Sequence, residues 1–351
     1  MTMPGDTAPK TSLQKTQALT RSGIWRPRNG MAYLLSPVSW VFGLLTRTRA
    51  ALYRRRWLSS EHPGRPVIVV GNVIAGGAGK TPVVMALVKH LRHRGWTPGV
   101  ISRGYGRTTR DCREVFAHSN PKDVGDEPLL IARLTGAPLF VARQRIEAAK
   151  ALLSAHPEVN VLVCDDGLQH LALERDVEIC VFNEEGLGNG MLLPAGPLRE
   201  PWPRKVDAVL YAGSAPHGSP SARFPVARSL ASCGYRADGQ QAELSSLIPG
   251  ALHALAGVAR PEQFFSALRD QGLELHRTTP LADHFDFDSA QGMWDEREVL
   301  ICTEKDAIKL WRHRPDAWAV PLQTRIDPDF FSWLDGKLPP HRSTPLSSPP
   351  A

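Results

Sequence analysis

Cysteine is scarce in this sequence, and no two cysteines are spaced for a shared metal or a compact disulfide framework. The 351 residues contain five cysteines, which are scattered singly: Cys112, Cys164, Cys180, Cys233 and Cys302. The absence of a Cys-x-x-Cys pair excludes the common zinc-binding spacings. It also favours a reducing compartment over a secreted, disulfide-bonded context.

A hydrophobic run long enough to cross a bilayer is also lacking. The candidate, residues 31–45 (MAYLLSPVSWVFGLL), is fifteen residues long and contains Pro37, whereas a transmembrane helix needs roughly 20 apolar residues. A signal peptide is disfavoured, because the run starts late and no small-residue cleavage site follows it. One remaining interpretation is a buried core helix. The other is a helix in the interface of an anionic membrane, which Trp40, Phe42, Tyr53 and the flanking arginines favour.

Excess basic charge is missing from most of the chain, although the formal net charge is +7. Residues 1–60 hold ten Lys and Arg against the single acid Asp6, which leaves 32 basic and 34 acidic residues, or −2, for the rest. A nucleic-acid-binding domain would spread basic residues over a folded face. We therefore expect no nucleic-acid partner, and we expect the N-terminal charge to act at a membrane surface.

The segment VIVVGNVIAGGAGKTP, residues 67–82, joins a strand-like run of β-branched residues to glycines and a Gly-Lys-Thr triplet. Apolar residues at helical spacing follow it. This order predicts a P-loop: backbone N–H groups surround a phosphate, Lys80 reaches the β- and γ-phosphates, and the Thr81 hydroxyl binds Mg²⁺. One position departs from the general motif, because Ile74 stands where its first glycine is expected. The residues predicted to bind the nucleotide are Asn72, Gly76, Gly77, Ala78, Gly79, Lys80, Thr81 and Pro82.

A second predicted strand ends in paired carboxylates. Residues 159–166 read VNVLVCDD, an apolar run that finishes at Asp165 and Asp166. On its own, this pattern is also typical of a strand that ends in a solvated acidic turn. Beside a P-loop, it predicts that one of the two aspartates holds Mg²⁺, directly or through water.

Eight motifs, in the same order along the chain, resemble the tetraacyldisaccharide 4′-kinase (lipid A 4′-kinase) family of Gram-negative bacteria. They are GNVIAGGAGKTP (71–82), VISRGYGR (100–107), VGDEPLLIA (124–132), DDGLQHLALERDVEI (165–179), GNGMLLPAGPLRE (188–200), ALAGVARPEQFF (254–265), the pair Asp283-His284 and TEKDAIK (303–309). The resemblance runs from about residue 29 to 335. The unusual glycine pattern around Ile74 is itself the pattern of this family.

The resemblance implies a kinase that transfers the γ-phosphate of ATP, with Mg²⁺, to the 4′-hydroxyl of tetraacyldisaccharide 1-phosphate. The product is lipid IVA in lipid A biosynthesis. The acylated disaccharide substrate implies a peripheral location on the cytoplasmic face of the bacterial inner membrane. The N-terminal segment would then serve to bind that membrane.

The resemblance also implies catalytic roles. It makes Asp126 the base that accepts the hydroxyl proton, with His284 as its partner and Lys80 as a catalytic cation. Asp126 as the N-cap of a helix that starts at residue 127 is the alternative interpretation. Because Asp126 and His284 fall in different predicted domains, we expect the domains to close over the nucleotide.

Other matched residues surround these. Arg199 and Glu200 are predicted near the nucleotide, with Glu200 in support of the metal, and an exposed ion pair is the alternative. His170 is predicted to orient the aspartate loop, and Gln169 is named as a further residue of the site. Guanidinium groups and an aromatic ring suit an anionic sugar, and the residues predicted to bind the substrate are Arg103, Tyr105, Arg107 and Arg145. A tight glycine turn is the alternative for residues 102–107.

Two functions of other classes remain open. A P-loop GTPase switch would carry an N/T-K-x-D guanine-binding motif, but in TEKD (303–306) the lysine comes one place late. A peripheral membrane protein that binds nucleotide without turnover would not need the paired aspartates or the Asp126 and His284 match. Both alternatives are therefore less favoured than the kinase.

The chain is longer than one hydrophobic core usually serves, so we expect two domains. We predict an α/β fold: a P-loop NTPase-like, mostly parallel sheet, then a smaller α/β domain whose strands include residues 206–211, 253–257, 299–303 and 318–322. The predicted division is a disordered tail (1–23), an amphipathic membrane-associated segment (24–58), the P-loop kinase domain (59–203), the smaller domain (204–338) and a disordered tail (339–351).

Overall fold

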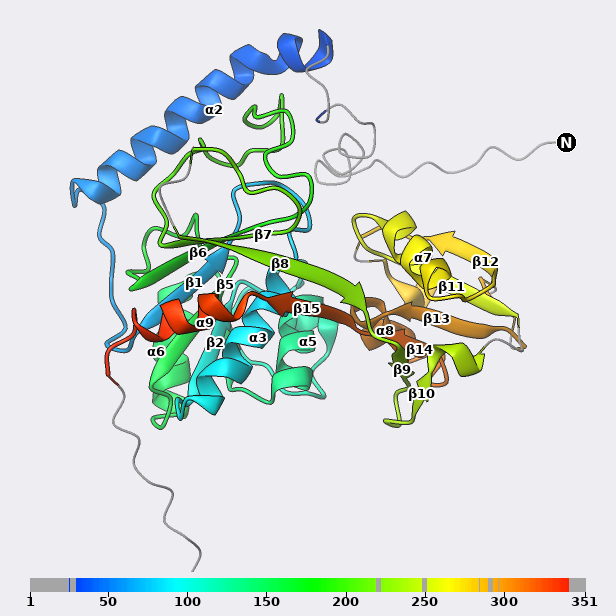
Figure 1. Ribbon diagram of the computed structural model, residues 1–351. Helices are drawn as coiled ribbons and strands as arrows, with labels where there is room; N and C mark the ends of the chain where they lie inside the picture. The colour runs from blue at the N-terminus through cyan, green and yellow to red at the C-terminus, as the bar shows by residue number, and fades with distance from the viewer. Residues whose placement is uncertain are drawn as a thin grey trace, which may run out of the picture.

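The structure is a computed structural model that describes residue 25 and residues 30–218, 222–247, 251–283, 285–289, 293–295 and 297–340. It shows two α/β bodies side by side, with a long N-terminal helix above the larger one (Figure 1). Three predictions fall outside the described residues: the tail 1–23, all but the first two residues of the tail 339–351, and the catalytic role of His284.

A nine-stranded sheet forms the centre of the larger body, in the order β15-β8-β7-β6-β1-β5-β2-β4-β3. Its strands are β1 (Val67–Gly71), β2 (Pro98–Ser102), β3 (Arg113–Glu114), β4 (Leu139–Val141), β5 (Val161–Asp165), β6 (Val177–Phe182), β7 (Ala208–Tyr211), β8 (Ala222–Leu230) and β15 (Leu322–Ile326). All neighbours pair in parallel except β3 with β4 and β15 with β8, at the two edges. The predicted mostly parallel α/β sheet is confirmed.

Helices cover both faces of this sheet, as a parallel sheet requires. They are α3 (Lys80–His93), α4 (Pro121–Val124), α5 (Asp126–Thr135), α6 (Arg145–Ala155) and α9 (Pro328–Asp335). Successive residues of β1 serve opposite faces: Ile68 and Val70 join the core formed with α3, α5 and α9, whereas Val67 and Val69 join the core formed with α6. The P-loop strand is therefore buried on both sides and gives the loop a rigid base.

A six-stranded sheet forms the smaller body, in the order β10-β9-β14-β13-β11-β12. Its elements are β9 (Cys233–Tyr235), β10 (Gln241–Glu243), the 3₁₀ turn η1 (Leu244–Leu247), β11 (Leu252–Ala256), α7 (Pro261–Asp270), β12 (Leu275–Pro280), the 3₁₀ turn η2 (Phe287–Ser289), β13 (Val299–Thr303), α8 (Glu304–Leu310) and β14 (Trp318–Val320). Helices α7 and α8 contribute to separate hydrophobic clusters of this body.

One strand prediction is wrong. Residues 206–211 were expected in the smaller body, but Ala208–Tyr211 is β7 and pairs in parallel with β6 of the larger sheet. An apolar run of this kind fits a buried strand of either sheet, and the pairing partner decides between them. The predicted strand 318–322 is also divided, because β14 belongs to the smaller sheet and Leu322 begins β15 of the larger one. We therefore propose that the smaller domain, about residues 232–321, is inserted between β8 and β15 rather than beginning at residue 204.

The N-terminal helix α2 (Gly30–Arg54) continues through Pro37. It is held by the loop after β6: Ser39 Oγ donates to the Leu192 carbonyl at 2.9 Å and accepts from the Ala195 N–H at 3.0 Å. A Cβ on Gly43 would lie 2.6 Å from Leu192 Cδ1, so the helix approaches this loop closely. Among the described residues, no helix is long and apolar enough to cross a membrane.

Candidate active site

The P-loop runs from the end of β1 to the first turn of α3. Gly79 precedes the helix with a φ of 72°, in the left-handed region that favours glycine. Lys80 is therefore the first helical residue, at the positive end of the helix dipole. Gly76 and Gly77 are exposed at the start of the loop, where a ligand has access to their backbone.

Lys80 meets the carboxylate of Asp166, which lies just beyond the end of β5. Lys80 Nζ is 3.4 Å from Asp166 Oδ1, and Arg199 Nη1 is 3.3 Å from Asp166 Oδ2. Asp166 has a φ of 47°, which is uncommon for a residue other than glycine and marks a sharp turn of the chain. The structure thus brings together three predicted site residues from distant parts of the sequence.

The two neighbouring aspartates have different electrostatic surroundings. Burial, with the negative charge of Glu127, raises the pKa of the Asp165 carboxyl. Burial also opposes ionisation of Asp166, but the charges of Lys80 and Arg199 outweigh it and hold the pKa of Asp166 below its usual value. Asp166 is therefore the more readily ionised member of the pair.

The carboxylate oxygens of Asp165 suit a magnesium ion. Asp165 Oδ2 accepts from Ser102 Oγ at 3.3 Å, whereas Asp165 Oδ1 is buried and has no hydrogen-bond partner among the described residues. A buried carboxylate oxygen without a donor is costly unless a cation or proton satisfies it. Mg²⁺ prefers such oxygen ligands and binds through one or two carboxylates together with substrate phosphates.

Arg145 lies beneath the aspartate loop, and its side chain is buried. Arg145 Nη2 donates to the Asp166 carbonyl at 3.1 Å, and the Arg145 backbone N–H donates to His170 Nε2 at 3.2 Å. Burial, with the charges of Arg145 and Arg175, lowers the pKa of His170 to about 4, so the imidazole is neutral and accepts this bond. The bond to His170 is the kind of contact that its predicted orienting role requires. Together, the two bonds connect Arg145 to the aspartate loop.

Gln169 connects the P-loop to Glu200. Gln169 Nε2 donates to the Asn72 carbonyl at 2.8 Å and to Glu200 Oε1 at 2.7 Å. Arg204 then pairs with Glu200 at 3.0 Å and with Glu178 at 2.7 Å. Glu200 is thus held in a partly buried network beside the site rather than in an isolated surface pair.

Asp126 lies on the side of the site that faces the smaller body. It is the first residue of α5 and Gly125 is the cap, so the alternative interpretation of Asp126 as an N-cap is wrong. Its Oδ2 is 2.7 Å from Nζ of Lys309, on α8. The next residue, Glu127, is close enough to Asp165 for its charge to raise the pKa of that carboxyl.

Tyr105 and Asp126 line a cavity of about 340 Å³ between the two bodies, together with Phe287 and Lys309. Arg103 is exposed, and its charge is among those that lower the pKa of His170, which places it toward the His170 side of the site. The Arg107 side chain packs against Gly104, and its burial lowers the pKa of the guanidinium. The predicted substrate residues therefore divide between two sides of the aspartate loop.

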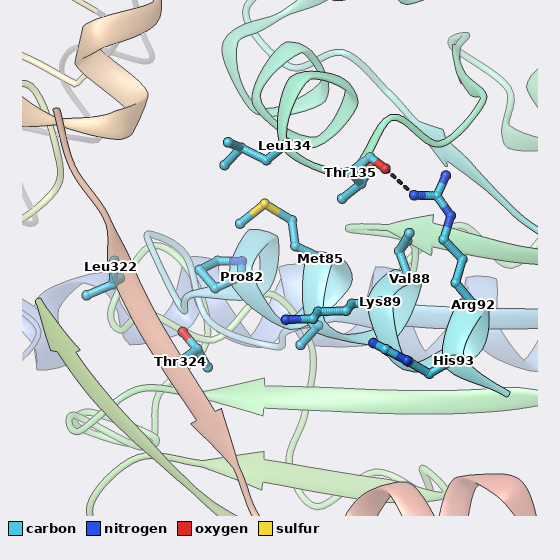
Figure 2. Close-up of a pocket in the computed structure, with 11 residues that line it drawn as sticks. Pro82, Met85, Val88, Lys89, Arg92, His93, Leu134, Thr135, Leu322 and Thr324 are labelled. Atoms are coloured by element: carbon cyan, nitrogen blue, oxygen red, sulfur yellow. Dashed lines mark hydrogen bonds between the residues drawn. The ribbon is translucent and has the colours of Figure 1, made fainter. Parts of the chain in front are cut away.

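A larger cavity, of about 500 Å³, lies on the outer face of α3. Figure 2 shows Met85 and Leu134 on one side of it and Leu322 on β15 at another. Of the predicted site residues this cavity includes Pro82, whose ring therefore faces away from the phosphate loop.

Three contacts at the site involve residues that the sequence did not predict. Lys309 belongs to the matched motif TEKDAIK, but nothing in its spacing indicated a bond to Asp126. Asn183, after β6, donates to the Gly77 carbonyl at 3.1 Å, and Arg228, on β8, donates to the Ala78 carbonyl at 2.6 Å. No local sequence pattern indicates the roles of Asn183 and Arg228, because each bonds to a backbone carbonyl more than a hundred positions away.

Comparison with known proteins identifies a family and several similar chains. The family model for tetraacyldisaccharide-1-P 4′-kinase matches residues 31–339. The chain is 60% identical over 316 residues to a tetraacyldisaccharide 4′-kinase of Acidovorax sp. (strain JS42), covering 90% of this chain and 93% of that protein. It is 58% identical over 329 residues to the one of Verminephrobacter eiseniae (strain EF01-2), covering 93% and 76%. A crystal structure of LpxK from Aquifex aeolicus in complex with ATP superimposes with a TM-score of 0.77 at 26% identity, covering 88% of this chain and 99% of that one.

The neutral state of His170 predicts a pH-dependent stability. Between pH 6.5 and about 4, His170 binds a proton in the unfolded chain but not in the folded chain. Its contribution to the free energy of unfolding is therefore complete above pH 6.5 and is lost as the pH falls toward 4. Thermal unfolding should show that His170→Gln removes part of the acid sensitivity of the wild type. His118→Gln, at an exposed histidine, is the matched control and should leave the curve unchanged. Parallel curves for the wild type and His170→Gln would contradict this assignment.

Proposed function

The chain belongs to the tetraacyldisaccharide-1-P 4′-kinase family, and we propose that its P-loop and strand-end aspartates bind Mg²⁺-ATP for transfer to tetraacyldisaccharide 1-phosphate. It is an ATP-dependent kinase of lipid A biosynthesis that phosphorylates the 4′-hydroxyl of a sugar. The contact of Lys80 and Arg199 with Asp166 carries the assignment of the site, because it joins the phosphate loop to the metal-binding carboxylates. Membership in this family sets aside the GTPase switch and the nucleotide-binding scaffold.

The residues of the site divide the work of phosphoryl transfer. Thr81, Asp165 and Asp166 would hold Mg²⁺, which when bound supplies positive charge to the β- and γ-phosphates. Lys80 and Arg199 supply fixed positive charge at the same place, and their pairing with Asp166 keeps them oriented before the nucleotide arrives.

Asp126 is placed to act as the base. A sugar hydroxyl is a poor nucleophile at neutral pH, so a carboxylate that accepts its proton lowers the barrier. As the proton moves to Asp126, the hydroxyl oxygen bonds to the γ-phosphorus and the bond to the leaving ADP oxygen breaks. The ion pair with Lys309 orients the Asp126 carboxylate for this transfer.

The partner role of His284 rests on its motif. Its described neighbour Asp283 pairs with Lys305 at 2.7 Å. Burial opposes the charge of Lys305, but Asp283, Glu127 and Asp126 together raise its pKa, so Lys305 lies near the proposed base.

Contacts between the bodies close one side of the cavity. Lys122 Nζ is 2.7 Å from Asp288 and 3.1 Å from Asp286. Exposed pairs of this kind are weak individually, whereas the pair between Lys309 and Asp126, which also joins the two bodies, is largely buried. We retain the proposal that the domains close over the nucleotide and exclude water from the γ-phosphate.

Substrate binding is proposed at Arg103, Tyr105 and Arg107. The ring of Tyr105 is 48% exposed in the cavity that contains Asp126, where it can face a pyranose. Arg103 and Arg107 add guanidinium groups that suit the anionic disaccharide. Arg145, through its bond to the Asp166 carbonyl, is proposed to act on the aspartate loop as well.

Helix α2 is proposed to bind the cytoplasmic face of the inner membrane. Its large apolar side chains are exposed, including Leu34 at 72%, Trp40 at 73% and Leu44 at 66%. Apolar side chains on one helix with arginines near its end are typical of a helix that lies in a membrane interface. The contact between Arg49 Nη1 and the Gln169 carbonyl, at 2.9 Å, brings this helix to the aspartate loop, where a lipid substrate must be received.

Replacement of the proposed base tests the mechanism. Asp126→Asn should lower the transfer of labelled γ-phosphate to tetraacyldisaccharide 1-phosphate by roughly 10²-fold or more, because the amide cannot accept the proton. ATP binding, measured by calorimetry, should be retained. The nearby Asp123→Asn is the matched control and should transfer phosphate at the wild-type rate. Equal rates for wild type and Asp126→Asn would remove Asp126 as the base.

Membrane binding is tested by making the exposed face of α2 polar. The double variant Trp40→Ser/Leu44→Ser should bind vesicles that contain anionic lipid at least tenfold more weakly, since burial of one large apolar side chain contributes about 1.5–3 kcal/mol. Co-sedimentation with the vesicles measures this. Leu322→Ser, at an exposed leucine of β15, is the control and should bind like the wild type. Unchanged binding of the double variant would contradict the role of α2.

A further inference from the structure

Three consecutive carbonyl groups of the P-loop accept hydrogen bonds from side chains, one from Asn72 at the start of the loop and two from Asn183 and Arg228, which lie outside it. Asn72 Nδ2 donates to the Gly76 carbonyl at 3.5 Å, Asn183 Nδ2 to the Gly77 carbonyl at 3.1 Å and Arg228 Nη2 to the Ala78 carbonyl at 2.6 Å. These donors come from the end of β1, the end of β6 and the interior of β8. The loop is thus bonded on its outer side, residue by residue.

The orientation of these carbonyls determines where the loop directs its N–H groups. The peptide bonds concerned are trans, and in a trans peptide the N–H points opposite to the C=O. With the carbonyls of residues 76, 77 and 78 directed outward, the N–H groups of Gly77, Ala78 and Gly79 point to the inner side of the loop. Among the described residues, none of these three N–H groups donates to a protein acceptor. Three convergent, unused donors at a helix N-terminus are what a phosphate requires.

Arg228 contributes the shortest of the three bonds. A Cβ on Gly79 would lie 2.4 Å from Arg228 Nη2, so the guanidinium packs directly on the backbone of that glycine. No carboxylate of the described residues forms an ion pair with Arg228, and its Nε is buried without a hydrogen-bond partner. Burial lowers the pKa of Arg228, as does the nearby charge of Arg260, while Glu184 partly offsets them.

This arrangement places a positive charge where it adds little to the stability of the folded protein. The partly buried guanidinium of Arg228 lies against Gly79, which caps the positive end of α3, and the repulsion between this cation and the helix dipole is unfavourable without an anion. A bound triphosphate would offset the repulsion. A charged donor on the Ala78 carbonyl also polarises the peptide, which makes the Gly79 N–H a stronger donor to that triphosphate.

We propose that Arg228 and Asn183 are positioning residues of the kinase, which hold the P-loop carbonyls outward so that the N–H groups of residues 77–79 converge on the phosphates of ATP. The inference rests on the proposed nucleotide site at residues 76–81. It adds two residues, from segments that share no motif with the P-loop, to the determinants of ATP affinity. It also gives Gly79 a second reason to be glycine, since the guanidinium occupies the place of a side chain.

The test compares five variants of the full-length protein, of which Lys80→Ala serves to check the nucleotide site itself. Arg228→Met removes the charged donor at similar length, Arg228→Lys restores a single charged donor, and Asn183→Asp replaces the amide donor but keeps the oxygen that accepts from the Glu185 N–H at 3.1 Å. Arg223→Met, at an exposed arginine of the same strand, is the matched control. Calorimetry with Mg²⁺ and a non-hydrolysable ATP analogue gives the dissociation constant, and steady-state kinetics give the separate KM values for ATP and lipid.

The expected result is a selective loss of nucleotide affinity. Arg228→Met should raise the dissociation constant for the analogue roughly 10- to 100-fold, as expected for a hydrogen bond to a charged group, and Asn183→Asp roughly tenfold. Arg228→Lys should recover part of the loss, and Arg223→Met should match the wild type. The KM for the lipid and the unfolding temperature without nucleotide should change little.

Two results would overturn the proposal. Wild-type nucleotide affinity in both Arg228→Met and Asn183→Asp would show that the outer bonds do not position the loop. A structural role alone would be shown by a different result: the KM values for lipid and ATP both rise, the unfolding temperature falls, and Arg228→Lys recovers none of these changes. Lys80→Ala distinguishes a failure of this proposal from a failure of the proposed nucleotide site. If Lys80→Ala binds the analogue like the wild type, the nucleotide site itself is misplaced. If Lys80→Ala binds the analogue weakly, the site is correct and only the role of the outer bonds is wrong.

Discussion

The ion pair between Lys80 and Asp166 is the contact on which the rest of the site depends. It joins the first residue of α3 to the turn after β5, and the two strands that support them, β1 and β5, are neighbours in the sheet. Because both loops leave the same edge of a parallel sheet, Lys80 and the two aspartates meet without a long excursion of the chain. Three further residues each contact one of the two aspartates at this point: Arg199, Arg145 and Ser102.

The burial of β1 on both faces gives this contact its rigidity. Alternate residues of the strand pack into the two cores on opposite sides of the sheet, so the loop that follows cannot shift without disturbing both. The smaller body is inserted after β8 and returns through β15, which keeps both of its connections on the larger sheet. Lys309 on α8 pairs with Asp126 beside Ile308, which packs into the core of the larger body, and the proposed base is shared between the two bodies.

The parts of the site that the sequence predicted are those with a local pattern. Strand, glycine loop and Lys-Thr are contiguous, and an apolar run that ends in Asp165 and Asp166 is readable without knowledge of its partners. The family resemblance added Arg199 and Asp126, whose positions no periodicity indicates. Pairing between strands was the least predictable feature, because the apolar residues of β7 would suit either sheet and only hydrogen bonding to β6 assigns it. Arg228 was missed for a related reason, since its partner is the Ala78 carbonyl, and a backbone acceptor leaves no trace in the sequence.

The central claim is that the P-loop and the strand-end aspartates form one metal–nucleotide site. The most direct measurement is the electron paramagnetic resonance of Mn²⁺, used in place of Mg²⁺, with a non-hydrolysable ATP analogue and the wild type, Asp165→Asn or Asp166→Asn. We predict that the wild type binds Mn²⁺ together with the analogue and that at least one substitution weakens this binding roughly tenfold or more, with Asp176→Asn as an exposed control that does not. Wild-type Mn²⁺ binding in both aspartate variants would contradict the account, because the metal would then be held elsewhere.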